Sequence, residues 1–596
     1  MSHLNRQCLV VLMLLWASNC GGVASEVDRS PVDLSLSPDG RWLVTANETS
    51  SSVSLIRTSD QQVMAEAACG SHPVDVEFCP DGKTFLVTSE WSGDVTIFSI
   101  ADGNLKRTGL ISVGFEPCAV TITRDSQRAF VGLFASGQVA EIDLPNQRLV
   151  RRIDVGRWPR SLTLSADDTR LAVGCSGESQ VSVLDANTGE KLYQEPLAYG
   201  VNIGHMLSSA DGKYAYFPWM VSRTNPINVS NLRKGWLLAS RIGRVRFDGP
   251  ADREAISLDV PELAVADPHG IVISRDQQRL VASSSGTHEL LVYRLPDLPF
   301  IGSGGPGDLI ERELQHDRDR FSRIEVGGRP MGMQLAANDR TLYVANYLKN
   351  CVQVVDLNSQ SITHEIELGG PAEVSLARRG MEIFYDGQRS LDQWYSCHSC
   401  HQNGGTNSRA MDTMNDGTAQ TLKTVLPLYH VTETGPWTWH GWQQDLDDAM
   451  HKSITSTMLG KAPSARDKLA LLTYLETLAT PPNPFRNPDG SLTVGAERGR
   501  QVFESDFAAC AQCHHGPHFS DGKNHDVGLN SPDDFYENYN TPSLRGTYRK
   551  ALWLHTGRAR SLERVVTDLH SPEKVAGTRK LTEQEARDLV EYLKSL

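Results

Sequence analysis

The sequence predicts a multidomain protein, an all-β seven-bladed β-propeller followed by two all-α domains. The first half repeats a four-strand pattern at intervals that are mostly 42 to 45 residues long. The second half repeats a helical pattern around two CxxCH motifs, Cys397–His401 and Cys510–His514. We therefore expect four segments: a leader (1–25), the propeller (26–370), a first helical domain (371–482) and a second one (483–596).

Composition places the chain among soluble globular proteins. It has 596 residues, of which 39% are hydrophobic and 22% are charged. The formal net charge of -14 argues against nucleic acid or an anionic membrane as a partner. It is compatible with a basic redox protein as a partner. No segment after the leader is apolar for eighteen residues, so we expect no membrane-spanning helix.

The N-terminus reads as an export signal. Arg6 precedes a short apolar run from Cys8 to Trp16, which is too short to span a bilayer but has the length of a signal-peptide core. Cleavage after Ser25 would satisfy the small-residue rule. The alternative is a lipid anchor on Cys20. Both routes predict a periplasmic or otherwise exported protein.

Seven units make up the repeat. Each has about four short alternating apolar runs with an Asp-containing turn between the first two, as expected for a four-stranded antiparallel sheet. Four strands at a period near 40 predict a β-propeller blade. The first unit starts on an inner strand and the last ends on an outer one, so ring closure must rest on packing rather than on an interlocked blade. The units open at Pro31, Pro73, Pro117, Pro159, Gly204, Pro268 and Pro330.

Two units are longer than the others, at 64 and 62 residues. Their extra residues include Trp219–Trp236, with Arg223, Asn225, Arg233 and Lys234, and the charged stretch Asp308–Arg323. Long insertions on a regular scaffold commonly carry contacts. Two interpretations stay open: the loops are surface decoration, or they grip the helical domains or a partner.

Histidines and cysteines in the repeat raise two further questions. His72, His205 and His269 start the first strand of three units, where they either satisfy local hydrogen bonds or converge on a metal or ligand. Five cysteines lie outside the leader and the CxxCH motifs. In an oxidising compartment this odd set predicts one or two disulfides and one free thiol. The five are Cys69, Cys79, Cys118, Cys175 and Cys351.

The CxxCH motifs predict two covalently bound haem c groups. Two cysteines three residues apart can form thioethers with both vinyl groups of one porphyrin, and the next histidine can bind the iron. Zinc would need two more ligands at each site, and neither surrounding sequence supplies them. Cys397, Cys400, Cys510 and Cys513 are therefore the expected haem-attachment residues, with His401 and His514 as the axial ligands.

Helical patterns surround each motif in the same order. Ala377–Phe384 precedes the first and Ala496–Phe503 the second, while Lys468–Leu478 and Glu585–Leu596 follow as closing helices. Pro481–Pro484 reads as a stiff linker between the copies. The order predicts two cytochrome c-like domains.

Two resemblances to known families rest on short motifs. Tyr343–Asn346 and Val352–Asp356 resemble YVTN-type propeller repeats, over about Ser30 to Gly370. The order TPSLRG, aromatic, His-Gly and SLE, over about Glu373 to Leu596, resembles the bacterial di-haem cytochrome c peroxidases and related di-haem oxidases. The second resemblance implies that one haem meets peroxide while the other relays electrons.

This second resemblance also implies roles for particular residues. Trp439 matches the tryptophan that couples the two haems in the family, although Trp437 and Trp439 could equally serve as packing against porphyrin. Arg545 matches an arginine that faces haem propionates. The carbonyls of 540–542 match a stretch that helps to hold an interdomain Ca²⁺, so calcium is a further cofactor candidate.

The sixth ligands decide the chemistry, because iron with a free position binds peroxide and capped iron transfers electrons. No methionine follows Met458, so the second haem lacks a methionine from its own domain. We expect His570 as its ligand, and His555 as a pocket residue. His515, His518 and His525 are expected to be solvated or to face propionates. For the first haem, the candidates are Met411, Met414, Met450 and, preferred by its place before the closing helix, Met458.

The chain departs from the peroxidase pattern in two respects. No histidine occurs between 402 and 428, where the family carries a distal one, and Glu433 is the only glutamate between His401 and Glu476. The roles of the two haems are therefore expected to be altered or exchanged. The leading hypothesis is a di-haem oxidoreductase acting with a redox protein or with an oxidant such as peroxide. The alternatives are an electron carrier whose propeller docks a partner enzyme, and a catalytic propeller with the haems as its electron sink.

Overall fold

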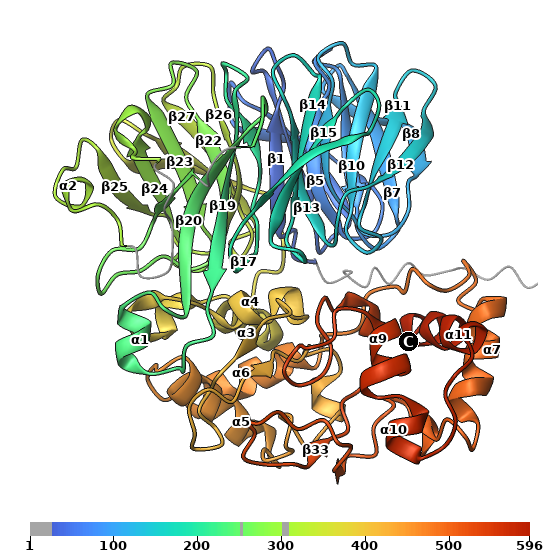
Figure 1. The fold of residues 1–596 in the computed structure, drawn as a ribbon. Helices are drawn as coiled ribbons and strands as arrows, with labels where there is room; N and C mark the ends of the chain where they lie inside the picture. Colours follow the sequence, from blue (N-terminus) through green and yellow to red (C-terminus); the bar gives the residue numbers. More distant parts are fainter. Residues whose placement is uncertain (1–26, 251–253, 301–308) are drawn as a thin grey trace, which may run out of the picture.

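The computed structural model describes residues 27–250, 254–300 and 309–596. The predicted leader, its cleavage site and Cys20 lie outside these residues. The chain forms two stacked halves, a propeller and a helical region beneath it (Figure 1). No helix in the described ranges is long and apolar enough to cross a membrane.

Seven antiparallel sheets form the propeller, which confirms the predicted seven blades. The first four blades each take four consecutive strands in sequence order. They are β1 (Pro31–Leu36), β2 (Trp42–Asn47), β3 (Ser52–Arg57) and β4 (Gln62–Ala68); β5 (Pro73–Phe78), β6 (Thr84–Ser89), β7 (Asp94–Ala101) and β8 (Asn104–Ser112); β9 (Pro117–Ile122), β10 (Arg128–Leu133), β11 (Gln138–Asp143) and β12 (Arg148–Asp154); β13 (Pro159–Leu164), β14 (Arg170–Cys175), β15 (Gln180–Asp185) and β16 (Lys191–Pro196).

The fifth blade differs because its inner edge is split into two short strands, β17 and β18, which both pair with β19. The last two blades return to the regular order. The strands are β17 (Gly200–Val201), β18 (Leu207–Ser208), β19 (Tyr214–Ser222), β20 (Leu238–Arg246) and β21 (Glu254–Ser257); β22 (Pro268–Ile273), β23 (Arg279–Ser284), β24 (Glu289–Arg294) and β25 (Phe321–Glu325); β26 (Pro330–Leu335), β27 (Thr341–Asn346), β28 (Cys351–Asp356) and β29 (Ser361–Glu367).

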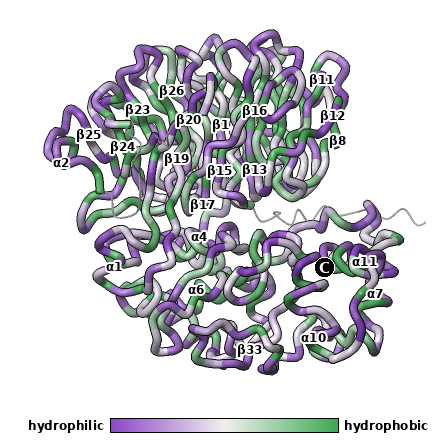
Figure 2. Tube along the Cα trace, in the orientation of Figure 1, coloured by the Kyte–Doolittle hydropathy of each residue, from purple (hydrophilic) through white to green (hydrophobic). Residues whose placement is uncertain are grey.

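The turn between the first two strands of a blade is fixed by a side-chain hydrogen bond. Ser37 Oγ donates to Asp39 Oδ1 at 2.7 Å, and the same carboxylate accepts from the backbone N–H of Arg41. An aspartate that binds its own turn stabilises the reversal locally. The pair recurs as Thr123–Asp125, Ser165–Asp167, Ser209–Asp211 and Ser274–Asp276. Between these polar turns the inner strands, such as β2 and β3, are rich in hydrophobic residues (Figure 2) and buried, whereas the outer strand, such as β4, is largely exposed. The buried residues pack neighbouring blades face to face.

The ring closes without an interlocked blade, as predicted. The first and last sheets are each built from one continuous segment, in the orders β1-β2-β3-β4 and β26-β27-β28-β29. Polar contacts join them: Asn350 Oδ1 accepts from the backbone N–H of Ser30 at 2.9 Å, and the Tyr347 hydroxyl donates to Glu48 at 3.2 Å.

The prediction of disulfides in the propeller is wrong. Cys69, Cys79, Cys118, Cys175 and Cys351 are all free thiols. The regular repeat places them on different strands or strand ends, with local partners instead of each other. Cys118 Sγ, for example, donates to the carbonyl of Pro159 at 2.7 Å. Burial raises the pKa of Cys79, Cys175 and Cys351 to about 12, so these thiols are protonated and weakly nucleophilic.

The helical region contains the same order of elements twice. An N-terminal helix, a one-turn CxxC helix, a π-helical turn and a closing helix follow one another in each copy. The first copy has α3 (Leu376–Phe384), α4 (Cys397–Cys400), α5 (Leu446–Lys452), the π turn Ser453–Thr457 and α6 (Ala465–Leu475). The second has α7 (Val494–Glu504), α8 (Cys510–Cys513), α9 (Leu562–Arg564), the π turn Val565–Leu569, α10 (Pro572–Ala576) and α11 (Glu583–Lys594).

Capping residues set where these helices begin. Ser375 and Thr493 accept hydrogen bonds from the first turns of α3 and α7, and Ser464 and Thr582 form capping boxes at α6 and α11. The side-chain oxygens satisfy N–H groups that have no partner inside the helix. The four predicted helices are thus confirmed, with starts up to three residues earlier than expected.

A glycine permits the helix crossing in each copy. A Cβ on Gly380 of α3 would lie 1.9 Å from the carbonyl oxygen of Ala470 in α6, and one on Gly499 of α7 would lie 2.0 Å from that of Asp588 in α11. Backbones that approach this closely exclude any side chain. The two crossings are therefore equivalent contacts.

The long insertion of the fifth blade reaches into the helical region. It forms α1 (Val229–Arg233), which lies under the propeller beside α3 and α4 (Figure 1). Arg233 Nε contacts Asp392 at 2.9 Å, and the backbone N–H of Ile227 donates to the carbonyl of Asp412 at 2.9 Å. Of the two open interpretations, the one in which this loop grips the helical domains is confirmed. The second insertion forms α2 (Arg312–Gln315) at the propeller periphery.

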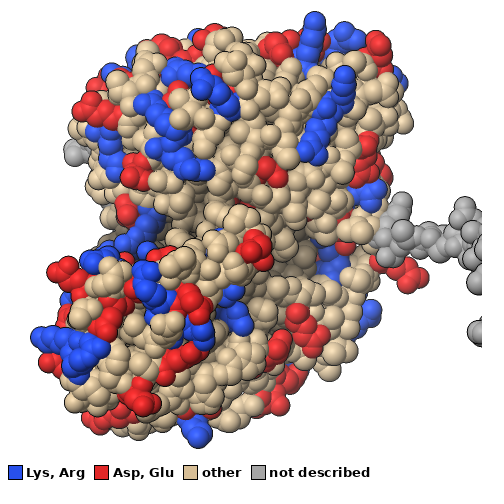
Figure 3. Space-filling view, turned by 90° about the vertical axis from the view of Figure 1, so that its right-hand side faces the viewer, with Lys and Arg blue, Asp and Glu red and all other residues tan. Residues whose placement is uncertain are grey.

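A second contact joins the propeller to the last third of the chain. The Arg549 guanidinium binds Glu116 at 2.6 Å, and the Arg157 guanidinium donates to the carbonyls of Ala551 and Arg560. Phe134 and Trp158 pack against Ala551 between these charges. The halves are joined at both copies, and the narrowing between them is visible in Figure 3.

The glycine crossing gives a direct test of the fold. Gly380→Ala should lower the free energy of unfolding by about 1–3 kcal/mol, because the added methyl forces α3 away from α6. Chemical denaturation followed by circular dichroism measures this loss. Arg379→Ala, at the exposed neighbouring position of the same helix, should change stability by less than about 0.5 kcal/mol. Equal effects of the two substitutions would contradict the close approach.

Candidate functional site

The first CxxCH motif presents a pre-oriented histidine. His401 Nδ1 lies 3.0 Å from the carbonyl oxygen of Leu426. A carbonyl only accepts hydrogen bonds, so Nδ1 carries the proton and Nε2 is left with a free lone pair. Burial lowers the pKa of His401 to about 4, which keeps the imidazole neutral. This is the state that an iron ligand requires.

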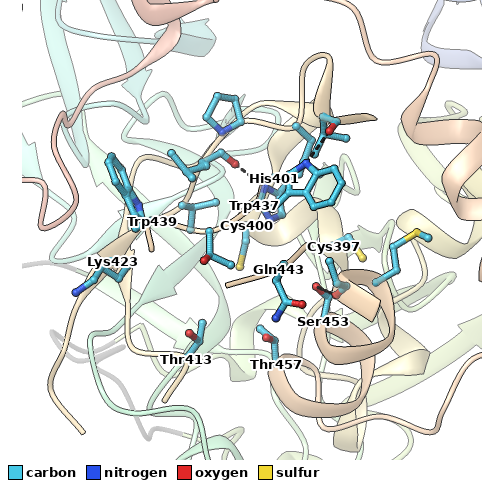
Figure 4. Close-up of a pocket in the computed structure, with 18 of the residues that line it drawn as sticks. Cys397, Cys400, His401, Thr413, Lys423, Trp437, Trp439, Gln443, Ser453 and Thr457 are labelled. Carbon is cyan, nitrogen blue, oxygen red and sulfur yellow. Dashed lines mark hydrogen bonds between the residues drawn. The ribbon is translucent and has the colours of Figure 1, made fainter. Parts of the chain in front are cut away.

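A cavity of about 370 Å³ opens beside this histidine. Figure 4 shows His401 and Trp437 on one side, with Thr413, Gln443 and Thr457 across the cavity from them. Cys397 and Cys400 border the same space, and Lys423 and Trp439 close one end. Two thiols, a neutral histidine and a largely apolar space are the groups that a covalently attached haem needs. The residues present therefore fit haem c.

The second CxxCH motif repeats this arrangement. His514 Nδ1 lies 2.9 Å from the carbonyl oxygen of Phe519, and burial lowers the pKa of His514. Cys510 lies against the hydrophobic core of the second copy, which includes Phe503, Leu562 and Leu589. The attachment residues predicted from the sequence thus have the same local geometry at both positions.

Backbone pairing aligns the two copies residue by residue. Trp437 bridges to Gln443 in the first copy, and Trp553 bridges to Ala559 in the second. This alignment makes Trp439 the counterpart of His555, and the two rings contact each other across the boundary between the copies, with centroids 6.2 Å apart. Trp439 therefore lines the first cavity and contacts the second copy, and its role between two haems stays a prediction. Trp437 and Trp553 pack near the cysteines of their own copies, which favours the packing interpretation for Trp437.

The candidate sixth ligands also occupy equivalent positions. Met458 and His570 each directly follow a π-helical turn. Met458 is 4% exposed, lines the cavity and lies with its sulfur 3.9 Å from that of Cys397. Met411 and Met450 line the same cavity, whereas Met414 is 40% exposed and does not. The structure brings three of the four candidate methionines to the first site.

His570 is suited to a ligand role at the second site. Its Nδ1 is buried and has no hydrogen-bond partner among the described residues. Burial, with a smaller effect of the neighbouring His514, lowers the pKa of His570 to about 4. A haem iron at this place would bind a neutral imidazole that has an unused nitrogen.

The other histidines of the second copy are engaged elsewhere. His518 Nε2 contacts Glu433 at 3.0 Å and His525 Nε2 contacts Asp521 at 2.8 Å, while His515 is exposed. Glu433, with a side chain 63% exposed, is outside the first cavity and cannot serve there as a distal acid. The cavity thus offers the amide of Gln443 and threonine hydroxyls where the peroxidase pattern has a glutamate and a histidine.

A buried ion-pair network fills the boundary between the copies. Asp534, whose side chain is 1% exposed, accepts hydrogen bonds from Lys423 at 2.6 Å, Tyr539 at 2.7 Å and His555 at 2.8 Å. Hydrogen bonds to the carboxylate hold the pKa of Asp534 well below its ordinary value, against the effect of burial. His555 therefore belongs to this network, and Lys423 comes from the first copy. Sequence reasoning missed both Asp534 and Lys423.

Arg545 lines the first cavity, as expected for a propionate-facing residue. Its Nε donates to the carbonyl of Pro517 at 2.9 Å, and its guanidinium lies over the ring of Phe519. The nearby Asn540 donates to the carbonyl of Pro436, and its Oδ1 is buried without a partner in the described chain. One spare oxygen is compatible with a calcium ligand but does not test the calcium prediction.

The propeller histidines do not form a common site. His72 contacts Glu48 at 3.0 Å and stacks on Trp91, whereas the rings of His205 and His269 lie together with centroids 4.5 Å apart. In the described residues, the only group of three or more side chains spaced for a metal ion is Cys513, Asp521 and His525, which includes a haem-attachment cysteine. The local hydrogen-bond interpretation therefore holds for His72.

Asp267 is a contact that sequence reasoning missed altogether. This buried propeller carboxylate accepts hydrogen bonds from Ser396 and Ser399, both at 2.6 Å, on either side of Cys397. Asn202 of the fifth blade donates to the carbonyl of Ser399 at 3.0 Å. The propeller thus holds the first attachment turn directly. No local pattern signals a contact between residues about 130 positions apart.

The Asp534 network makes a testable prediction. Asp534→Asn should lower the free energy of unfolding by about 3–5 kcal/mol at pH 7, because it leaves the Lys423 ammonium buried without a counter-charge. Because folding lowers the pKa of Asp534, its contribution is complete above pH 3.8 and is lost as the pH falls further. Denaturation across this range measures both effects. Asp533→Asn, at the exposed neighbour, is the matched control and should be near neutral.

Comparisons with known proteins identify a β-propeller region and a cytochrome c region in the chain. Residues 13–210 match the family model YNCE-like beta-propeller, and residues 496–596 match Cytochrome c. Hydrazine synthase from Kuenenia stuttgartiensis includes a chain of the same fold, with a TM-score of 0.50 and 21% identity over 56% of this chain and 98% of that one. The likeness to that solved structure concerns the fold alone.

Two relatives found by sequence each cover 38% of the chain. The methylamine utilization protein MauG of Methylorubrum extorquens is 24% identical over an alignment of 280 positions, which covers 78% of that protein. Hydrazine synthase subunit gamma of Kuenenia stuttgartiensis is 30% identical over an alignment of 278 positions, which covers 79% of that protein. With a cytochrome c region that implies covalently bound haem c, the chain belongs to the family of hydrazine synthase subunit gamma.

Proposed function

We propose that the chain is an exported redox enzyme with two covalently bound haem c groups, one in each copy of the helical region, and that it acts on a small oxidant such as peroxide. The observation that carries the proposal is the inequality of the two sites. The first site has an open cavity beside His401. At the second site, the position equivalent to Met458 is taken by His570, whose Nδ1 is buried and has no hydrogen-bond partner among the described residues.

Each residue set has a definite task in this proposal. Haem c supplies an iron that exchanges single electrons and, where a position is free, binds a small oxidant. Cys397 and Cys400 anchor the first group and Cys510 and Cys513 the second, while His401 and His514 bind the iron through Nε2. Arg545 and Lys550, which line the first cavity, supply positive charge for propionates.

The first site is the better candidate for chemistry. Gln443, Thr413 and Thr457 place hydrogen-bonding groups across the cavity from His401, where they can orient a small polar molecule. Trp439 borders this cavity and contacts His555 of the second copy, so it can couple the two sites electronically. Two relatives, a hydrazine synthase subunit and a methylamine utilization protein, support a redox role in small-molecule metabolism.

The alternative function is electron transfer alone, without a substrate. Its support is Met458, which is buried in the first cavity with its sulfur close to Cys397. If this sulfur binds the iron, neither haem has a free position, and the protein is an electron carrier whose propeller docks a partner enzyme. Calcium, held near Asn540, stays a proposed further cofactor in either case.

Haem content tests the number and place of the groups. Cys397→Ala with Cys400→Ala, and separately Cys510→Ala with Cys513→Ala, should each remove one of two haems, because thioether bonds hold each group at one motif only. Quantitative pyridine haemochrome absorbance with intact-protein mass spectrometry measures the stoichiometry. If one pair of substitutions removes both haems, or removes neither, while circular dichroism shows a folded protein, the two sites are not independent.

Ligand substitutions separate the two functions. In low-temperature electron paramagnetic resonance, His570→Ala should convert one low-spin signal into a high-spin one, because it removes a strong-field ligand. Met458→Ala should increase the rate of peroxide turnover several-fold if methionine restricts access, and leave it unchanged if the site is already open. A wild-type protein with two low-spin haems and no reaction with peroxide would favour the electron carrier.

A further inference from the structure

An exposed aromatic patch lies on the helical region, outside the haem cavity. Phe535 is 68% exposed and Tyr536 is 41% exposed. The two rings contact each other with centroids 4.9 Å apart, and Tyr536 also contacts the half-buried Trp442 at 4.9 Å. Two large aromatic side chains this exposed, side by side, mark an interaction surface rather than a core defect.

Acidic side chains surround this patch in the sequence. Asp533 and Glu537 flank the two aromatics, and both are exposed. Neither makes an ion pair with a lysine or arginine of the described chain. Asp445 and Asp448, close to Trp442 in sequence, are exposed as well. With a net charge of -14 on the whole chain, this surface complements a basic protein. Acidic groups are also spread over the helical half in Figure 3.

A continuous series of rings leads from the patch to the boundary between the two copies. Trp442 stacks on His440 with centroids 4.6 Å apart, and His440 contacts Tyr539 at 5.0 Å. Tyr539 stacks on His555 at 4.2 Å, and His555 contacts Trp439 at 6.2 Å. Each pair of neighbouring rings in this series is in contact. The surface is thus linked through π systems to the tryptophan that borders the first haem cavity.

We propose that the patch of Phe535 and Tyr536 with its acidic rim is the docking site of a basic one-electron redox protein, and that the ring series connects this partner to the haem region. The proposal rests on the redox function above and adds the partner and its place of docking. One electron leaves the reduced iron of the partner, which becomes ferric, and reduces one ferric haem of this chain. No atom is transferred and no further reactant is needed.

His440 is the position where the series can be interrupted. Tyr536 and Trp442 both contact His440, and the described series continues from His440 to Tyr539. His440 is 4% exposed and lines the first cavity, so a substitution here alters neither the exposed rings of the patch nor the charges of its acidic rim. Docking and electron transfer can therefore be measured as separate properties.

The test uses the intact two-haem protein with a ferrous, lysine-rich mitochondrial cytochrome c as the probe. Calorimetric titration at low salt gives Kd, and stopped-flow absorbance gives the electron-transfer rate. Asp533→Lys with Glu537→Lys should raise Kd at least tenfold and flatten its salt dependence, and Phe535→Ala with Tyr536→Ala should raise Kd about fivefold. His440→Leu should leave Kd unchanged and slow electron transfer at least tenfold.

Matched controls lie far from the patch. Glu583→Lys alters an acidic side chain that is 93% exposed, and Val494→Ala alters an apolar residue that is 77% exposed. Both should bind the probe as the wild type does. Equal Kd values for wild type and the Asp533→Lys, Glu537→Lys variant would overturn the docking site. So would a change of oligomeric state in the patch variants, seen by analytical ultracentrifugation, because the patch would then join two copies of this chain.

Reduction by ascorbate, a small donor that needs no docking surface, distinguishes this proposal from the function on which it rests. Charge-reversed protein should still be reduced by ascorbate at the wild-type rate. A wild-type protein that binds the probe but does not turn over peroxide would remove the enzymatic function and leave the docking site standing.

Discussion

A buried carboxylate of the propeller, Asp267, holds the first haem-attachment turn in place. Ser396 and Ser399 donate to its two oxygens, so the turn between the predicted thioether cysteines cannot move without breaking both bonds. A carboxylate this buried is costly to leave unpaired, because its desolvation is offset only by these hydrogen bonds and by neighbouring charge. The propeller is therefore in direct contact with the first CxxCH motif rather than a separate module. The insertion that ends in α1 and the Arg549–Glu116 pair extend this contact over both copies.

Duplication explains the symmetry of the helical region, and the positions at which the two copies differ include the candidate sixth ligands. Equivalent glycines at 380 and 499, equivalent π turns and equivalent tryptophan bridges show that the same geometry was used twice. At two equivalent positions the side chains differ: Met458 corresponds to His570, and Trp439 corresponds to His555. The second difference lies at the boundary, where the two unlike rings touch and the Asp534 network ties Lys423 of one copy to His555 of the other. The ring contact and the ion pairs between the two copies thus occupy the same place.

Predictions succeeded where the contacting residues are close in sequence and failed where they are far apart in sequence. The blade turns, helix caps and CxxCH geometry follow from residues within about five positions of each other, and these predictions hold. The disulfides were expected from an odd number of cysteines, but the repeat places Cys118 on the first strand of one blade and Cys175 on the second strand of the next, and both are free thiols. Asp267, Asp534 and Lys423 went unnoticed because each acts on a residue more than a hundred positions away. Gln443 and threonines line the first cavity, and no motif marks them.

Residue spacing was sufficient for the seven blades, the two attachment motifs and the closing helices, because period, turn chemistry and CxxCH all operate within one strand or one helical turn. Folding in three dimensions was needed to decide which methionines reach the first site, why Met414 does not, and which rings connect the surface to Trp439. These depend on how the two copies and the propeller pack against each other. Packing brings together side chains whose separation along the chain carries no signal, and burial then sets their charge.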